Sequence, residues 1–183
     1  MKSKLKLDWV AIRAAKYACA RWHYSETIPV GKKACIGVWE NDVFIGVIIY
    51  AHGVTPKLGN PYGLQQHQCI ELSRVALKEH IAPVSRIVSI SIKLIKRRFK
   101  NIKMLISFAD PSEGHHGGIY QAMNWFYIGD TTPGIEYEIN GKRVHNRQYR
   151  GTVFGQPKSK LPSHAIKKKT LGKHRYVFPL HND

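Results

Sequence analysis

Apolar residues in the N-terminal part of the chain recur with the spacing of regular secondary structure. The segment 9–22 (WVAIRAAKYACARW) is rich in helix formers, and its apolar residues follow the period of an amphipathic helix. Two runs of β-branched and apolar residues follow at 34–40 and 43–50. They are joined by Asn41-Asp42, which is typical of a two-residue hairpin turn. This pattern predicts a helix and then a β-hairpin.

The middle of the chain alternates between strand and helix patterns. Strands are predicted at 69–77 and 103–108. The segment 86–100 fits either state by periodicity, but its length and its cationic end favour a helix, since cations suit the negative end of the helix dipole. A short helix is predicted at 119–126. Its apolar residues are expected to face the core: Ile119, Ala122, Met123 and Phe126.

This order of elements predicts one mixed α/β domain in residues 1–155. A Pro- and Lys-rich basic extension follows at 156–183, in which 174–180 is expected to dock as a terminal strand. The region 52–68 is rich in Gly and Pro and is expected to form a loop that could cover a site.

Charge changes this picture by indicating a partner. The chain has 29 Lys and Arg residues against 12 Asp and Glu, a net charge of +17. No acidic residue lies between Glu79 and Asp110 or between Glu138 and Asp183, which is typical of proteins that bind polyanions. DNA is favoured over a merely solvated basic face or an anionic membrane, because no strongly amphipathic, Trp-edged basic helix is present. The expected DNA contacts are Lys93, Lys96, Arg97, Arg98, Lys167, Lys168 and Lys169.

Cysteine usage and hydropathy bear on the compartment. The three cysteines form no C-x-x-C motif, which fits reduced, buried thiols. The basic N-terminus lacks the apolar stretch of a signal peptide, and no apolar run of membrane-spanning length is present. We therefore expect a cytoplasmic protein.

Polar residues concentrate in the segment 107–129 (SFADPSEGHHGGIYQAMNWFYIG), directly after a predicted strand. Ligands bind at this end of strands in open α/β sheets. The Asp110 carboxylate and the backbone beside Pro111 offer the acceptors needed to hold the exocyclic amine of a base. The alternative is that Asp110 only caps the turn before Ser112.

Glycines and a tyrosine complete this loop. Gly117 and Gly118 permit close backbone approach to a ligand, and the helix that follows would direct its N–H groups at an anion. Tyr120 in the first turn of that helix either reaches the cleft or packs half-buried. His115 and His116 are adjacent, so they cannot easily chelate one metal, and both are expected to face solvent.

Two further positions are candidates for binding an anionic donor. Ser85 and Arg86 open a helix after the strand at 69–77, although the glycines of a usual phosphate loop are missing. Arg74 lies within that strand, where alternation places it on one face with Leu72. There it either pairs with a carboxylate or contacts an anion.

Sequence motifs for metals and nucleotides are missing. The chain contains no H-E-x-x-H, Walker loop or G-x-G-x-x-G. A metal site assembled from His23, Asp110 and a distant residue stays open.

Several short motifs, taken in order, resemble one protein family. They are RWHYS (21–25), GVWE (37–40), FIGVI (44–48), ELSRVA (71–76), PVSR (83–86), FADP (108–111) and GHHGGIYQA (114–122). Together they resemble the Mom family of phage DNA-modification proteins. The run IYQAMNWFYIG (119–129) is similar to the closing half of a GNAT-like acyltransferase fold.

The resemblance implies a GNAT-like domain with a central, mostly antiparallel sheet flanked by helices. It implies that the protein methylcarbamoylates the exocyclic amine of adenine in duplex DNA, which protects phage DNA from host restriction. The functional positions it implies are His23, Tyr24, Arg74, Ser85, Asp110 and Tyr120. The donor would be acetyl-CoA or another small molecule, and the family also raises iron as a cofactor. The segment 82–86 (APVSR) departs from the usual glycine-rich pyrophosphate loop.

Three other functions remain open at this stage. The fold would also suit an N-acetyltransferase that acts on another amine. Asp110-Pro111 suggests an adenine methyltransferase, but Ser112-Glu113 follows where those enzymes usually have another Pro and an aromatic residue. The charge alone would suit a non-catalytic DNA-binding protein. The sequence leaves the oligomeric state, monomer or homodimer, undecided.

Overall fold

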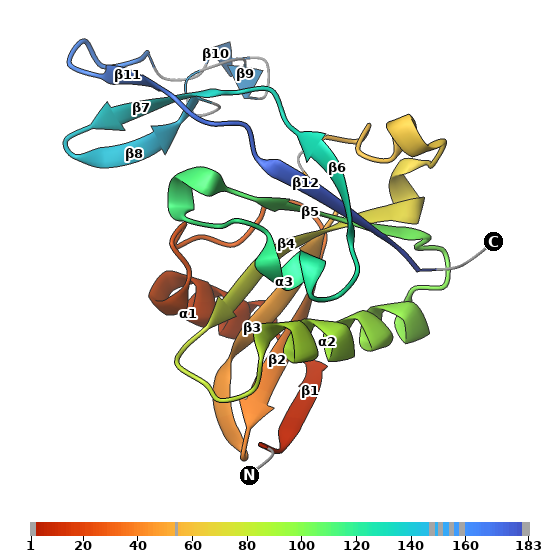
Figure 1. The fold of residues 1–183 in the computed structure, drawn as a ribbon. Helices are drawn as coiled ribbons and strands as arrows, with labels where there is room; N and C mark the ends of the chain where they lie inside the picture. Colours follow the sequence, from red (N-terminus) through yellow and green to blue (C-terminus); the bar gives the residue numbers. More distant parts are fainter. Residues whose placement is uncertain are drawn as a thin grey trace.

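The protein, described from a computed structural model, is built around a seven-stranded sheet (Figure 1). The structure describes residues 3–53, 55–146, 149, 152–153, 156–157 and 160–180. All neighbouring strands are antiparallel except β4 and β5, which run parallel. In sheet order the strands are β1 (Leu5–Trp9), β2 (Lys33–Glu40), β3 (Val43–Ala51), β4 (Cys69–Leu77), β5 (Met104–Ala109), β12 (His174–Pro179) and β6 (Phe126–Asp130).

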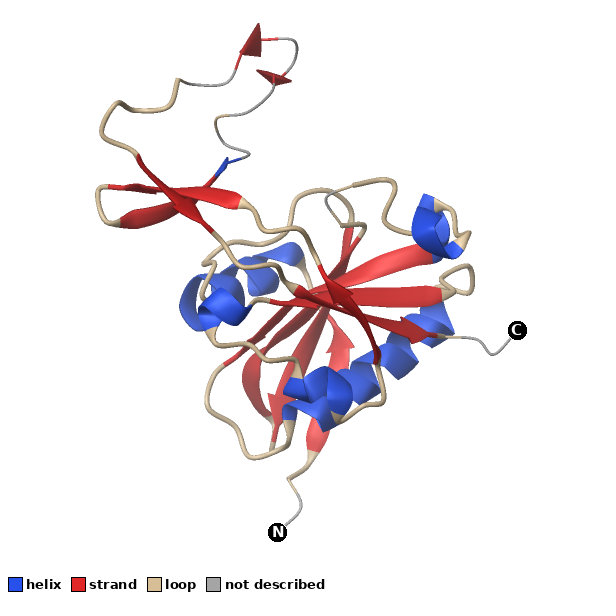
Figure 2. Ribbon diagram, turned by 45° about the horizontal axis from the view of Figure 1, so that its top comes forward, coloured by secondary structure: helices blue, strands red, loops and turns tan. Residues whose placement is uncertain are grey.

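Helices cover both faces of this sheet (Figure 2). Alternate side chains of β3 pack on opposite faces of the sheet, because successive side chains of a strand point in opposite directions. Val47 and Ile49 pack with α1, whereas Ile48 and Tyr50 pack with α2. The helices are α1 (Ile12–Trp22), α2 (Val84–Arg98) and the single turn α3 (Gly118–Gln121), with 3-10 turns η1 (Asn60–Tyr62), η2 (Gln66–Gln68) and η3 (Pro111–Glu113). Among the described residues, no helix is long and apolar enough to cross a membrane.

The hairpin and the two long helices agree with the sequence pattern. Asn41 and Asp42 both have positive φ angles, 51° and 64°, which is the conformation of the expected two-residue turn. The ambiguous segment that begins near residue 86 is the helix α2. Strand β1 was not expected. Its side chains alternate between half-buried and exposed, but its five residues, LKLDW, follow a charged terminus and give too short a pattern.

The prediction for Phe126 was wrong. The predicted helix at 119–126 ends after Gln121, and Asn124 has a φ of 58°, which reverses the chain. Trp125 fills the core in its place, with 5% of its surface exposed. Phe126 begins the edge strand β6 and remains 59% exposed. Ala122 is likewise exposed rather than part of the core.

A β-bulge in β4 overturns another expectation. The pairing with β3 joins Arg74 to Ile49 but Leu72 to Tyr50, so Ser73 is an extra residue. Leu72 therefore packs on the α2 side, while Arg74 shares the α1 side with Ile49. Simple alternation would place Leu72 and Arg74 together.

A second, three-stranded sheet extends from the main body in the order β11, β7, β8 (Figure 1). Its strands are β7 (Ile135–Ile139), β8 (Lys142–His145) and β11 (Ile166–Lys169), and β9 (Thr152–Val153) pairs with β10 (Gln156–Pro157) nearby in sequence. Strands β11 and β12 both pair with strands that precede residue 155. Residue 155 lies outside the described residues, so the domain division there stays a prediction.

Candidate functional site

A cavity of about 490 Å³ opens where β4 and β5 diverge. The two strands pair only over Cys69–Glu71 and Met104–Ile106, and beyond these residues they separate. Side chains from four places line the gap: the end of α1, the two diverging strands, the start of α2, and the loop that leads into α3. The polar and aromatic lining residues are His23, Tyr24, Ser73, Arg74, Phe108, His115, His116 and Tyr120. Six site residues predicted from sequence thus line one cavity: His23, Tyr24, Arg74, Gly117, Gly118 and Tyr120.

Tyr120 lies on the buried side of this cavity. Its side chain is 7% exposed, and its hydroxyl is 2.7 Å from Ser107 Oγ. Ser107 donates its single hydroxyl hydrogen to the Leu72 carbonyl at 2.8 Å, so Tyr120 must donate to Ser107. Burial raises the pKa of Tyr120 to about 12, although the Ser107 hydrogen bond acts in the opposite direction. The phenol is therefore protonated at neutral pH, with a free lone pair.

Tyr176 of β12 fixes the position of Tyr120. The two rings stack with their centroids 4.9 Å apart. Gly117 has a φ of +77°, and a Cβ atom there would lie 2.2 Å from the Tyr176 hydroxyl oxygen. Only glycine therefore allows the loop to pass this close to β12. A Cβ at Gly118, by contrast, would meet nothing within 4 Å.

His23 and Tyr24 follow the last turn of α1, and their rings pack 4.4 Å apart. The Ser25 backbone N–H donates to His23 Nδ1 at 3.1 Å, so the imidazole hydrogen is on Nε2. Burial, followed by the charge of Arg74, lowers the pKa of His23 to about 4. The ring is therefore neutral at physiological pH. Tyr24 is 50% exposed and contacts the His115 ring edge-on at 5.5 Å.

Arg74 is held by backbone carbonyls. Its Nε donates to the Thr27 carbonyl at 3.2 Å and a terminal nitrogen donates to the Ser73 carbonyl at 2.7 Å. The bulge at Ser73 turns the guanidinium towards the α1 side, where it lines the cavity. These two carbonyls are neutral and do not cancel its charge, and the choice between a carboxylate pair and an anion contact stays a prediction.

Asp110 does not line the cavity, although the sequence favoured it as a direct contact. Its side chain is buried, and both carboxylate oxygens have partners: Oδ1 accepts from the Ser112 N–H at 3.0 Å and Oδ2 lies 2.8 Å from Lys173 Nζ. Burial raises the pKa of Asp110, but the hydrogen bond and charge of Lys173 outweigh it, so the pKa is lowered. Asp110 therefore joins the loop after β5 to the start of β12, and the turn-capping alternative describes its contacts better.

The start of α2 reaches the cavity through Val84. Ser85 is half-buried and Arg86 is exposed, and neither lines the cavity. No side chain caps this helix, and the Arg86 N–H donates to the Pro83 carbonyl at 3.0 Å, so only the N–H groups of Val84 and Ser85 in its first turn are available. The amides of Ile81 and Ala82, just before it, donate to the Glu40 carboxylate at 2.8 Å each.

Known proteins resemble this chain in sequence as well as in fold. The model of the Mom protein family matches residues 4–183. The chain belongs to the Mom family. It is 25% identical over 146 residues to the methylcarbamoylase mom of Escherichia phage Mu. The matched region covers 78% of this chain and 60% of the Mu protein. The chain thus matches less than two thirds of the length of that curated relative.

Solved structures place this Mom family chain in the GNAT fold, as the sequence predicted. The Salmonella typhimurium protein yncA with its cofactor acetyl-CoA superposes with a TM-score of 0.56 at 9% identity, over 98% of this chain and 95% of that one. A GNAT-family acetyltransferase from Chromobacterium violaceum gives a TM-score of 0.52 at 10% identity, over 98% and 85% of the two chains.

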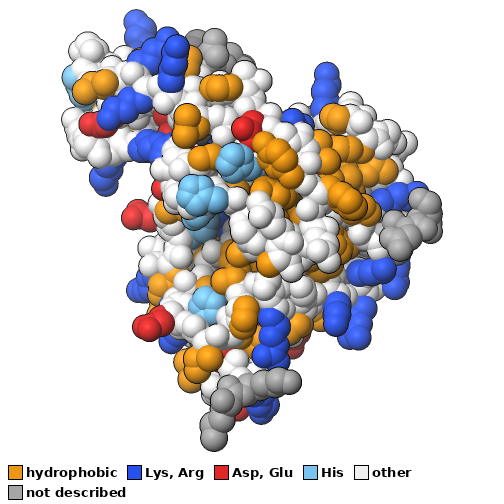
Figure 3. All heavy atoms as spheres, in the orientation of Figure 1, with side chains coloured by type: hydrophobic (Ala, Val, Ile, Leu, Met, Phe, Trp, Pro, Cys, Tyr) orange, Lys and Arg blue, Asp and Glu red, His pale blue; other side chains and the backbone are white. Residues whose placement is uncertain are grey.

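Two further predictions for this Mom family member concern an anion site at α3 and the lysines and arginines expected to contact DNA. Helix α3 is one turn long, so it has too few aligned peptides for the expected anion-binding dipole. The expected DNA contacts form two groups, one on α2 and one on β11 in the small sheet, where Lys and Arg side chains gather (Figure 3). Lys168 of the second group is ion-paired with Glu138.

The part of the chain that the structure describes does not fit an iron site. No group of three or more His, Cys, Asp or Glu side chains among the described residues is arranged to hold a metal ion. Of the two candidates for such a site, Asp110 has both carboxylate oxygens engaged by Ser112 and Lys173, and His23 has its Nδ1 atom engaged by Ser25.

Sequence reasoning missed Ser107. It is 1% exposed and bridges the divergence of the strands by contacting both Leu72 and Tyr120. The available signal was a single hydroxyl in the otherwise apolar strand MLISFA. A buried polar residue in such a strand requires partners, and it is therefore informative.

Proposed function

We propose that this chain transfers a methylcarbamoyl group to the exocyclic amine of adenine in duplex DNA, and so modifies phage DNA against host restriction. Membership of the Mom family supports the reaction class, as does the name of the Mu relative. The observation that carries the proposal is the protonated Tyr120 hydroxyl, which is held by Ser107 inside a cavity between diverging strands.

The cavity suits a donor with a narrow, extended chain. Such a chain would lie between β4 and β5, where the strands have no partners for each other. Its anionic part would meet the uncapped start of α2 and the side chain of Ser85. Pro83 has no N–H, so this segment offers fewer amide donors than a glycine-rich loop. An acyl-CoA therefore fits as a class of donor, bound with fewer phosphate contacts than usual.

The acceptor would reach the cavity from the side of α1. An adenine amine in duplex DNA is stacked and paired, so it must be flipped out, at a cost of a few kcal/mol. Tyr24 is half-exposed and packs against His23 and His115, so these rings offer a stacking surface for the flipped base. We assign His23 and Tyr24 to the base and Arg74 to anion binding. Asp110 holds the loop rather than the base.

These residues supply the groups that the transfer needs. For a CoA thioester whose carbonyl carbon already bears the methylamino nitrogen, a bond forms between the adenine nitrogen and that carbon, while the bond from the carbon to the leaving sulfur atom breaks. The Tyr120 O–H, which donates to Ser107 in the free protein, would turn to the leaving atom and give it its proton, which suits a phenol that is protonated at neutral pH. The nitrogen becomes cationic as it attacks and then loses one proton. Because that proton is acidic, a weak base such as neutral His23, or water, is sufficient.

The decisive experiment is mass analysis of nucleosides from the DNA of cells that express the chain. Modified adenosine is expected, and its mass increment identifies the transferred group. A parallel culture with Tyr120→Phe should yield unmodified adenine. If the wild-type protein leaves adenine unmodified, the proposal is wrong. An increment that corresponds to acetyl would instead support an N-acetyltransferase, the rival that the GNAT fold keeps open.

A further inference from the structure

The outer face of α1 carries cations that the sequence motifs did not single out. Arg13, Lys16 and Arg21 are all exposed on this face. Arg13 and Lys16 are neighbours three residues apart, and Arg21 lies about 80° around the helix from Arg13. We call these three residues the α1 stripe. The helix contains no acidic residue, and Asp8 and Glu26 are the nearest acidic residues in the sequence. The stripe is therefore positive along its whole length.

Aromatic contacts hold part of the stripe in place. The Arg21 guanidinium lies 4.0 Å from the centre of the Tyr17 ring, and Tyr17 packs edge-on against Trp22 at 5.6 Å. A guanidinium stacked on a ring has less conformational freedom, but its N–H groups at the edge remain free to bind phosphate oxygens. Arg21 is thus arranged for binding before a ligand arrives.

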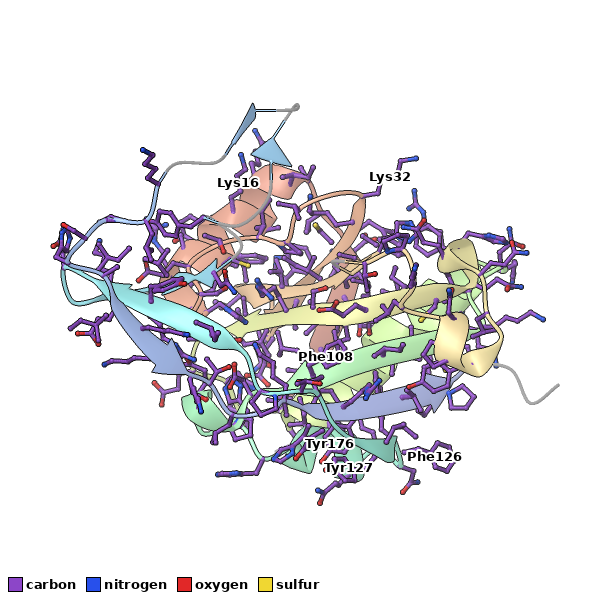
Figure 4. All side chains as sticks on the ribbon, turned by 90° about the horizontal axis from the view of Figure 1, so that it is seen from above. Lys16, Lys32, Phe108, Phe126, Tyr127 and Tyr176 are labelled. Carbon is purple, nitrogen blue, oxygen red and sulfur yellow. The ribbon has the colours of Figure 1, made fainter. Side chains whose placement is uncertain are left out.

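The stripe leads directly to the cavity. Arg21 is two residues before His23, which lines the cavity with Tyr24. The α2 cations lie on the other face of the sheet. Arg98, at the far end of that helix, is about 20 Å along its axis from Val84, the α2 residue that reaches the cavity. Figure 4 shows Lys16 on α1, on the opposite side of the molecule from the edge-strand residues Phe126 and Tyr127.

We propose that the α1 stripe binds the phosphate backbone of the duplex whose base enters the cavity. This inference rests on the proposed function and adds the surface that positions the DNA. A flipped base stays attached to its own strand, so the phosphates beside it must lie close to the cavity mouth. The α1 cations can neutralise them, because α1 ends at the cavity and Lys16 and Arg13 lie only about 10 and 15 Å along its axis from His23. The α2 cations are disfavoured because that helix packs on the other face of the sheet.

The test is the salt dependence of duplex binding, measured by fluorescence anisotropy with a labelled oligonucleotide. Three triple variants each remove three positive charges: R13A/K16A/R21A on α1, K93A/K96A/R97A on α2, and K57A/K100A/K103A as a charge-matched control. The slope of log K against log salt falls by roughly 0.9 for each phosphate that the protein no longer neutralises. The slope for the α1 variant should therefore be shallower by about 2–3, a larger change than in either of the others.

The outcomes separate the two proposals. If the wild-type chain binds and modifies DNA but the α1 variant keeps the full slope, or the slope of the α2 variant falls further, only the α1 inference is overturned. If the wild-type chain shows no salt-dependent DNA binding, the proposed function fails as well. Should the α1 triple variant unfold, R13A/K16A leaves the Arg21–Tyr17 stack intact and should reduce the slope by about 1.8.

Discussion

Two buried tyrosine–serine pairs in this protein have the same chemistry but different surroundings. Tyr50 lies 2.7 Å from Ser91 Oγ, and Ser91 donates to the Val88 carbonyl at 2.7 Å. Tyr120 and Ser107 repeat this arrangement, with the Leu72 carbonyl as the final acceptor. Burial raises the pKa of both phenols. Tyr50 is closed within the core at 0% exposure, whereas Tyr120 lines the cavity.

The comparison shows which property would separate a functional pair from a structural one. A high pKa and a short hydrogen bond also arise in a core pair that stabilises the packing of α2 on β3, so neither identifies a catalytic group. What distinguishes Tyr120 is access: its side chain lines a space where a ligand can lie. The core pair therefore provides matched controls for experiments on the cavity pair.

The largest effect is expected from Tyr120→Phe. Loss of a positioned proton donor lowers the rate by about 10²–10⁴-fold. The fold should persist because the ring stack on Tyr176 remains. The measurement is the fraction of modified adenosine, together with thermal unfolding of the variant.

Tyr50→Phe serves as the control, since it removes the same hydroxyl from the core. It should lower stability by about 1 kcal/mol and leave the activity of the folded protein unchanged. Equal loss of activity in both variants would contradict the assignment.

Gly117→Ala should disturb the packing that holds Tyr120. Its Cβ atom would meet the Tyr176 hydroxyl oxygen at 2.2 Å, and the φ of +77° is unfavourable for alanine. Crowding and backbone strain together should lower the free energy of unfolding by about 2–4 kcal/mol. Gly114→Ala separates the two causes, because Gly114 has a φ of +72° but open space around it. It should be destabilised by only about 1–2 kcal/mol in chemical denaturation. Equal destabilisation of the two variants would mean that contact with Tyr176 is unimportant.

The structural elements that could be predicted from the sequence are those that depend only on residues close together along the chain. The Asn41-Asp42 turn, the amphipathic α1 and the strand before Asp110 follow from local periodicity. The bulge at Ser73 arises from the pairing of β4 with β3, which no local pattern contains. It alone decides that Arg74 faces α1. The sequence favoured Asp110 as a contact of the base amine because its partner, Lys173, is far away along the chain, just before β12.

Ser107→Ala should lower activity less, about 10-fold, since it leaves the phenol in place but removes the hydrogen bond that lowers the pKa of Tyr120. Ser91→Ala is the control: it should cost similar stability, about 1–3 kcal/mol, without reducing the activity of the folded protein. A merely structural role for Ser107 would give the two variants the same behaviour. If Ser107 acts through Tyr120, the double variant with Tyr120→Phe should be no less active than Tyr120→Phe alone.

The smallest effect at neutral pH is expected from His23, on the exposed side of the cavity. Its pKa is lowered to about 4 in the folded protein, mainly by burial, against about 6.5 in an unfolded chain. The unfolded chain therefore binds more protons, so the contribution of His23 to stability is fully present above a pH of about 6.5 and is lost as the pH falls towards 4.

His23→Gln removes this titration. The difference between the two proteins in urea unfolding should change progressively between about pH 7 and pH 4, with the wild type becoming less stable relative to the variant. A constant difference across that range would mean that His23 is accessible to protons, and that the α1 side of the cavity is wetter than its packing against Tyr24 indicates.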